Sequence, residues 1–512
     1  DLEKMKSPRF KGLLLLLFVA TLFTACQKEL PPVEDSLTYI PEDAAMVTAI
    51  RLQQLMDKAD FESLKQTEGF QNMLEDAAEE NATLAKVLAD PAASGIDLSK
   101  NMYVSLELSD SEPIMTVASF SIADQEALEQ MMESLKVEAT PVSNDFKYFD
   151  TPGKASVAWN DEVLLLGMVD ESISVKDRLL RYLETPADAS VADNTNLREQ
   201  LQGDFDVLNW MSSDFILRSR NWQTSGNLLN YDKEQLSGQY MAHALTFEKG
   251  VIENQVMLDL SGQLKNDLGM FFRDEVTTDF ISAAPTGTPA FLLTAAFDIN
   301  GVNQLLVEKY SKGVAEKTLN QFGLSAKELL QAFSGDMMLA GYESPKGAAL
   351  FAATVADEAP LRTLLDEATE DNKLDKISDN RYRFLRWERE AEADSSYVKT
   401  SVEMEGEVLL HDGLFFIANQ SALLDQIEAG DTGLSGELAQ QSAQAMGEHI
   451  FTTFGNPALM SAFDFEAEQI QEVEASANRE GIQLRLEMDN QETNSLRYLI
   501  ELMEKEQDEA EL

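Results

Sequence analysis

The chain has 512 residues, of which 90 are Asp or Glu and 40 are Lys or Arg, giving a formal net charge of −50. This acidity disfavours binding to nucleic acid and adhesion to anionic membranes, because both require basic surface. A hydrophobic content of 44% is typical of a globular protein, and the length predicts two or more domains.

The N-terminal segment has the order of an export signal. Three basic residues precede an apolar run at 13–23, and the small residue Ala25 stands directly before Cys26. The run is shorter than the roughly 20 apolar residues of a membrane-spanning helix, and polar residues follow it at once. We therefore expect residues 1–25 to be a signal peptide, preceded by a few residues upstream of an initiating Met5.

The segment Phe23-Thr24-Ala25-Cys26 resembles a bacterial lipobox, in which the cysteine receives a diacylglycerol and becomes the N-terminus after cleavage. Phe23 departs from the usual Leu at the first position of that motif. Cys26 is the single cysteine of the chain, so lipid attachment there leaves no thiol for disulfides or cysteine catalysis. The alternative is an ordinary secretory signal with an incidental cysteine.

The residues after Cys26 also carry resemblances. Gln27-Lys28-Glu29 resembles the surface-export signal of lipoproteins in Bacteroidota-type Gram-negative bacteria, which implies display on the outer leaflet of the outer membrane. Asp35-Ser36-Leu37 resembles the O-glycosylation sequon of the same group. We expect residues 26–36 to form an extended tether, because they include two adjacent prolines. Loss of the four basic and two acidic residues of 1–25 makes the mature net charge −52.

Two helices of similar sequence are predicted 233 residues apart. The segments "IADQEALEQMMESL" (122–135) and "VADEAPLRTLLDEA" (355–368) each place apolar residues at i, i+3, i+4 and i+7, the spacing of an amphipathic helix. Asp124 and Asp357 stand where each helix begins, so both are predicted N-caps.

Strands on both sides of these helices match as well. Each predicted copy opens with a strand through Thr-Ala, later has a turn aspartate before a buried strand, and ends with an alternating strand and a helix. In the last strand the shift between copies is 228 residues. The matched positions are Thr48 and Thr294, Asp161 and Asp412, and Val256 and Leu484.

These ordered matches predict an α+β protein with two tandem homologous domains, residues 37–275 and 283–505, followed by an acidic tail at 506–512. Each domain is predicted to be a largely antiparallel sheet with helices packed on one face. The second copy carries an inserted charged segment at 387–407, predicted to be a longer loop. A doubly wound parallel sheet is the alternative, but no glycine-rich phosphate loop follows any strand.

Three segments resemble one known family: "YIPEDAAMVTAIRLQQLMDKA" (39–59), "LADPAASGIDLSKNMYVSLE" (88–107) and "LLQAFSGDMMLAG" (329–341). They are similar to the domain of unknown function 4836 family of Bacteroidota-type envelope lipoproteins, over nearly the whole mature chain. The resemblance implies an envelope location and this architecture. It implies no activity, because none is established for the family.

No catalytic or metal-binding constellation stands out in the sequence. His243, His411 and His449 are not spaced as metal ligands, so we expect neither a metal nor a cofactor, and His411 is predicted to be a turn residue. Asp431-Thr432-Gly433 resembles an aspartic-protease loop but lacks apolar flanks and a second copy, so an ordinary loop is predicted. The segment "GDTGLSGE" does not have the order of a G-x-S-x-G elbow.

Other enriched residue types are predicted to be structural. The acidic segment 366–380 lacks the order of an EF-hand and is predicted to be a solvated loop after a helix. Met131-Met132 and Met337-Met338 are predicted to pack in the core, with an adaptable apolar groove as the alternative. Core packing is also predicted for the tryptophans, although Trp210 or Trp222 offers a surface for sugar stacking. The four are Trp159, Trp210, Trp222 and Trp387.

The leading functional hypothesis is a surface-directed outer-membrane lipoprotein, lipid-attached at Cys26, that binds a partner protein or an apolar envelope ligand without catalysis. The alternative is a carboxylate-dependent hydrolase acting on envelope or extracellular glycans, with its carboxylate pair hidden among the 90 acids. A deep pocket with converging carboxylates would favour the hydrolase. A continuous sheet with an apolar groove between sheet and helices would favour the binding protein.

Overall fold

A computed structural model gives the fold of most of the chain. It describes residues 34–107, 114–142, 146–151, 155–169, 175–213, 236–271, 273, 279–304, 330–344, 347–391, 397–434, 442, 449, 451–456, 469–479 and 481–510. The signal segment and Cys26 lie outside these residues. Within the described ranges, no helix is both long enough and apolar enough to cross a membrane.

Twenty strands of the described chain form one sheet in which all the strand pairs are antiparallel. The first half of the chain contributes ten strands: β1 (Met46–Ile50), β2 (Met102–Glu107), β3 (Met115–Ser121), β4 (Thr140–Pro141), β5 (Lys147–Thr151), β6 (Ala155–Trp159), β7 (Val163–Val169), β8 (Val207–Ser212), β9 (Tyr240–Glu248) and β10 (Val251–Asp259). The second half contributes β11 (Pro289–Ala296), β12 (Phe333–Tyr342), β13 (Ala348–Val355), β14 (Leu374–Lys376), β15 (Arg381–Ala391), β16 (Tyr397–His411), β17 (Leu414–Ala418), β18 (Phe451–Gly455), β19 (Ile470–Ala477) and β20 (Gly481–Met488).

The described helices surround this sheet. They are α2 (Asp35–Thr38), α3 (Leu52–Lys58), α4 (Phe61–Leu64), α5 (Glu68–Glu80), α6 (Ala82–Ala89), α7 (Gln125–Ser134), α8 (Lys176–Leu183), α9 (Thr195–Gln200), α13 (Gly262–Gly269), α14 (Asp279–Ser282), α15 (Ile299–Val302), α18 (Glu358–Glu370), α19 (Ser421–Glu428) and α21 (Ser495–Ala510). The prediction of an α+β protein with an antiparallel sheet is therefore confirmed, and the parallel alternative is wrong.

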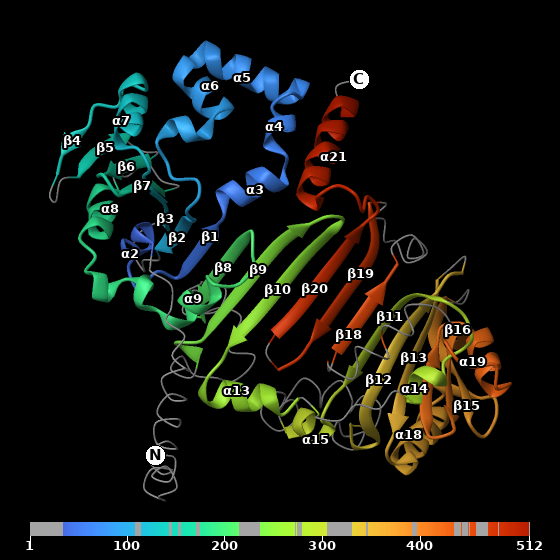
Figure 1. Cartoon of the computed structure of the whole chain (residues 1–512). Coiled ribbons are helices and arrows are strands. Elements are labelled where there is room, and N and C mark those ends of the chain that lie inside the picture. The colour runs from blue at the N-terminus through green and yellow to red at the C-terminus, as the bar shows by residue number, and fades with distance from the viewer. Residues whose placement is uncertain are drawn as a thin grey trace, which may run out of the picture.

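The two halves are joined within the sheet by one strand pair. From one edge the order is β4-β5-β6-β7-β3-β2-β1-β8-β9-β10, and it continues as β20-β19-β18-β11-β12-β13-β17-β16-β15-β14. Strands β10 and β20 lie side by side at the centre (Figure 1), with registers from Val251↔Glu487 to Met257↔Gly481. We call this pairing the seam. One continuous sheet thus replaces the two separate sheets that the sequence predicted.

Helices cover both faces of the outer parts of the sheet, which corrects the prediction of helices on one face. In β7, Val163 and Leu165 pack in a cluster with Leu179 of α8, whereas Leu164 packs with Leu128 of α7. Successive strand residues point to opposite faces, so α7 and α8 lie on opposite sides. The reason is visible in the sequence, since three adjacent buried residues require cover on both faces.

The second half repeats this two-sided cover. Phe416 packs with Leu424 of α19, and its neighbour Phe415 packs with Leu361 of α18. Strand registers link α8 and α19 to one face of the sheet and α7 and α18 to the other. We call these the α8/α19 face and the α7/α18 face.

Most elements that the sequence predicted are present. Asp124 caps α7 by accepting a hydrogen bond from the backbone N–H of Ala127, and Asp357 caps α18 in the same way. The match of Thr48 with Thr294 is wrong in register, because Thr48 points to the α7/α18 face and Thr294 to the α8/α19 face. The inserted segment 387–407 belongs largely to the long β15–β16 hairpin rather than to a loop.

The folded domain begins before the predicted end of the tether. Asp35 and Ser36 lie in α2, and Ser36 is fully buried. Its hydroxyl oxygen accepts a hydrogen bond from Ser121 at 3.0 Å, and its carbonyl accepts one from Ser119 at 2.8 Å. Leu37 follows in the core. An O-linked glycan on Ser36 is incompatible with this packing.

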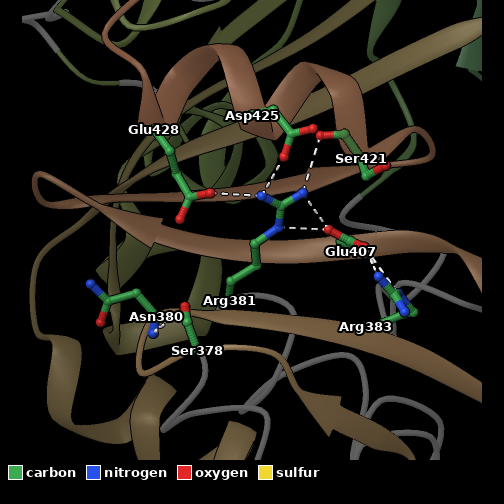
Figure 2. Close-up of polar contacts among 8 residues, drawn as sticks. All are labelled: Ser378, Asn380, Arg381, Arg383, Glu407, Ser421, Asp425 and Glu428. Atoms are coloured by element: carbon green, nitrogen blue, oxygen red, sulfur yellow. Dashed lines mark hydrogen bonds and ion pairs between the residues drawn. The ribbon is translucent and has the colours of Figure 1, made fainter.

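A buried arginine ties α19 to the sheet (Figure 2). Arg381 of β15 donates to Glu407 of β16 and to Asp425 and Glu428 of α19, each at 2.6 Å, and Glu407 is only 3% exposed. Arg383 donates to the other oxygen of Glu407. Although burial acts to lower the pKa of the Arg381 guanidinium, the carboxylate hydrogen bonds raise it above its ordinary value.

We predict that Arg381→Ala lowers the free energy of unfolding by about 3–5 kcal/mol, because it removes the main counter-charge of a buried Glu407. Urea unfolding followed by circular dichroism measures this loss. Lys147→Ala is the matched control, since its ion pair with Glu129 is about 40% exposed on each side and is worth roughly 0–1 kcal/mol. Equal effects of the two substitutions would contradict this role for Arg381.

Candidate functional site

The largest described pocket lies on the α8/α19 face of the seam and has a volume of about 560 Å³. Helix α9 forms one wall, and strands β8, β9, β10, β19 and β20 form the floor. We call this pocket the seam groove. Its floor and wall include Gln200, Trp210, Tyr240, Gln255, Asp259, His449, Ser476, Asn478 and Gln483.

The groove has a polar floor because the two seam strands alternate in character. Gln255 of β10 lies directly opposite Gln483 of β20, and both side chains are exposed on the α8/α19 face. Their strand neighbours Val256 and Ile482 are also opposite each other but point to the other face. The same alternation that makes one face of the seam apolar therefore makes the groove floor polar.

One wall of the groove is aromatic. Trp210 of β8 and Tyr240 of β9 stack with ring centroids 4.7 Å apart and an angle of 19° between the planes. Trp210 is 2% exposed, whereas Tyr240 is only partly buried. The buried indole therefore fixes the ring that faces the groove, at little cost in side-chain freedom.

A narrower extension of about 170 Å³ continues the groove along the seam and shares Gln255, Ser476 and Gln483 with it. Here Arg485 of β20 pairs with Glu253 of β10 at 2.9 Å and with Glu487 at 2.7 Å. Although burial acts to lower the pKa of Arg485, its hydrogen bonds to these carboxylates raise it. The guanidinium is therefore already neutralised by the protein.

Two carboxylates line the main part of the groove. Asp259 at the end of β10 accepts a hydrogen bond from the amide of Asn196, and Glu199 lies on α9. The described residues contain no group of three or more His, Cys, Asp or Glu side chains that would hold a metal ion. What the groove offers chemically is a set of amides, two carboxylates and an aromatic wall.

A smaller pocket of about 210 Å³ lies between the ends of β8–β10 and helix α13. It is apolar, with Met211, Met241, Leu258 and Leu264 among its lining residues. This is where the described chain would accommodate the apolar ligand that the sequence suggested. That ligand stays a prediction.

The three histidines do not come together. His243 lies on the α7/α18 face of β9, opposite Val256, and His449 lines the seam groove on the other face. His411 ends β16 beside the Asp412-Gly413 turn, as predicted, where its Nε2 is 3.6 Å from Asp412.

The other singled-out segments are structural in the described chain. Asp431 accepts a hydrogen bond from Thr286 in an exposed loop after α19. The acidic segment 366–380 is not one loop, because it contains the end of α18 and the edge strand β14. Met132 and Met338 are buried in core clusters.

The tryptophans are only partly covered by the structure. Trp159 and Trp210 are buried at 2% exposure, as predicted, and Trp210 also forms part of the groove wall. Trp387 lies in β15, and Trp222 and Cys26 fall outside the described residues.

Sequence reasoning missed Gln255 and Gln483. The shift of 228 residues that relates Val256 to Leu484 also relates Gln255 to Gln483. A polar pair at matched positions of two alternating strands was therefore a usable signal. What the sequence did not reveal is that these two strands are neighbours.

Comparison with solved structures finds distant likenesses. Crystal form III of TP0453 matches with a TM-score of 0.27 and 13% identity, over 44% of this chain and 80% of that one. Crystal form I of TP0453 matches with a TM-score of 0.25 and 10% identity, over 46% and 84%. Likenesses at this level support no inference about function. Among the curated proteins, none matches this chain.

The family comparison is more informative. The pattern of the family "Domain of unknown function (DUF4836)" matches residues 38–344, which is more than half of the chain. All three segments that resembled the family lie at least largely within this range, although the match covers less than the nearly complete mature chain that we expected. It begins within α2 and extends through β12. The chain therefore belongs to the DUF4836 family.

Proposed function

We propose that this chain is a surface-displayed outer-membrane lipoprotein, lipid-attached at Cys26, that binds a ligand in the seam groove without catalysing a reaction. The observation that carries the binding role is the groove of about 560 Å³ where the two halves meet. Ligand sites favour such concave junctions between structural units. The lipobox-like Phe23-Thr24-Ala25-Cys26 supports the anchor.

We also propose that the halves are two copies of one unit, residues 37–275 and 283–505. The mirrored strand order on the two sides of the seam supports this. So does the seam register, because Gln255 faces Gln483, the residue 228 positions on, and Val256↔Ile482 mirrors Asn254↔Leu484. A local two-fold axis between the two glutamines would produce this symmetry, and it places the groove on that axis.

A glycan hydrolase remains the second candidate, because Glu199 and Asp259 both line the groove. Hydrolases of this class need one carboxylic acid and one carboxylate on either side of the bond that breaks. Asp259 is held by Asn196, which suits a fixed hydrogen-bond acceptor as well as a reacting group. Turnover of a bound glycan that disappears in Glu199→Gln while binding persists would favour the hydrolase.

For the anchor, we predict that wild-type protein expressed in its native envelope incorporates an alkyne-tagged palmitate and that Cys26→Ala does not. The physical reason is that Cys26 supplies the single thiol available for lipid attachment. Gln27→Ala is the matched control, which should keep the label and lose surface display. Labelling that persists in Cys26→Ala, or wild-type protein that resists protease on intact cells but not after lysis, would contradict this part of the proposal.

For the binding site, we predict that natively purified protein retains a compound detectable by mass spectrometry and that Gln483→Trp removes it. The larger ring fills the groove floor, because Gln483 is exposed there. Ile482→Trp is the matched control, since Ile482 is the next residue, is 46% exposed and points to the opposite face. Retention in Gln483→Trp, or loss in both variants, would place the ligand elsewhere.

A further inference from the structure

Resting on the binding role above, we propose that the seam groove binds a neutral oligosaccharide. Amide side chains dominate its polar surface, with Gln255 and Gln483 on the floor and Gln200 and Asn196 on α9. Each amide both donates and accepts hydrogen bonds, as a sugar hydroxyl does. A surface of neutral amides therefore matches a ligand that carries many hydroxyls and no charge.

The aromatic wall supplies the apolar contact that sugar rings require. One side of a pyranose ring carries C–H groups that pack against an aromatic face. Tyr240 borders the groove and is held in place by stacking on buried Trp210. A rigid, partly exposed ring with amides nearby serves both sides of such a ligand.

The charges in the groove exclude anionic ligands. Among the described residues that line the groove and its extension, Arg485 is the one arginine or lysine, and it is paired with Glu253 and Glu487. Glu199, Asp259 and Glu474 add negative charge, and the whole chain carries −50. A phosphate, sulfate or uronate would therefore meet repulsion with no free counter-charge.

The floor is also unsuited to an extended peptide. Peptides that bind sheets do so by adding a strand to an exposed edge. Strand β10 is hydrogen-bonded to β9 and β20, and β20 is hydrogen-bonded to β10 and β19. Because neither seam strand has a free edge, a ligand reaches the floor through side chains alone, as an oligosaccharide would.

The size of the groove fits a short oligomer. Small-ligand pockets have volumes of roughly 300–1,000 Å³. The main groove has about 560 Å³, and its extension along the seam adds a narrower continuation at Gln255 and Gln483. An elongated site of this kind fits a chain of repeated sugar units better than a single ring.

The test uses the purified full chain, isothermal titration calorimetry and six defined probes. The neutral probes are maltotetraose, cellotetraose, mannotetraose and chitotetraose, and the anionic probes are a heparin tetrasaccharide and tetragalacturonate. We expect at least one neutral probe to bind and neither anionic probe to do so. Gln255→Leu, Gln483→Leu and Tyr240→Ala should each weaken binding at least tenfold, whereas Ile482→Ala should leave it within twofold.

Thermal unfolding of each variant checks that weaker binding is not a loss of fold. Binding of the anionic probes alone, no binding of any neutral probe, or equal binding by Gln483→Leu and the wild type would overturn the proposal. These outcomes are separable from failure of the binding role. If the natively purified chain holds a non-carbohydrate compound that Gln483→Trp removes, the groove is a ligand site and the oligosaccharide assignment is wrong.

Discussion

The hydrogen bonds between β10 and β20 are the interaction on which the rest of the architecture depends. They join two sets of ten strands into one sheet and place Gln255 beside Gln483. Without them, a nine-residue and an eight-residue strand would present free edges, which in most proteins invite aggregation. The outermost strands of the whole sheet, β4 and β14, are by contrast only two and three residues long. Long strands are thus consumed at the seam and short ones are left at the edges.

Buried charges of opposite sign fix a helix to the sheet in each half. In the second half, Arg381 of the sheet pairs with carboxylates of α19. In the first, Arg181 of α8 lies 2.8 Å from Glu107 of β2. Burial raises the pKa of Glu107, while the neighbouring arginines act to lower it. A strongly acidic chain therefore places its few arginines where a carboxylate would otherwise be buried alone.

Local patterns predicted most elements, and long-range pairing decided what they missed. The spacing of Leu361 and Leu365 correctly placed α18, and Asp357 correctly marked its start. The adjacent buried residues of β7 signalled helices on both faces, but we assigned them to one. The seam joins residues more than 220 positions apart, and alternation within a strand does not say which strand lies next to it. The groove was therefore not predictable from local sequence, although its glutamines stand at matched positions of the two copies.

The most direct test of this account is a cross-link across the seam. In a chain with Cys26→Ala, the pair Gln255→Cys and Gln483→Cys places two thiols at directly opposite positions, about 4.5–5.5 Å apart at Cβ. The account predicts that mild oxidation joins them by a disulfide, detected as a linked peptide by mass spectrometry. The pair Gln255→Cys and Ile482→Cys should stay unlinked, because those side chains point to opposite faces. No link in the first pair, or equal linking in both, would contradict the seam and the groove built on it.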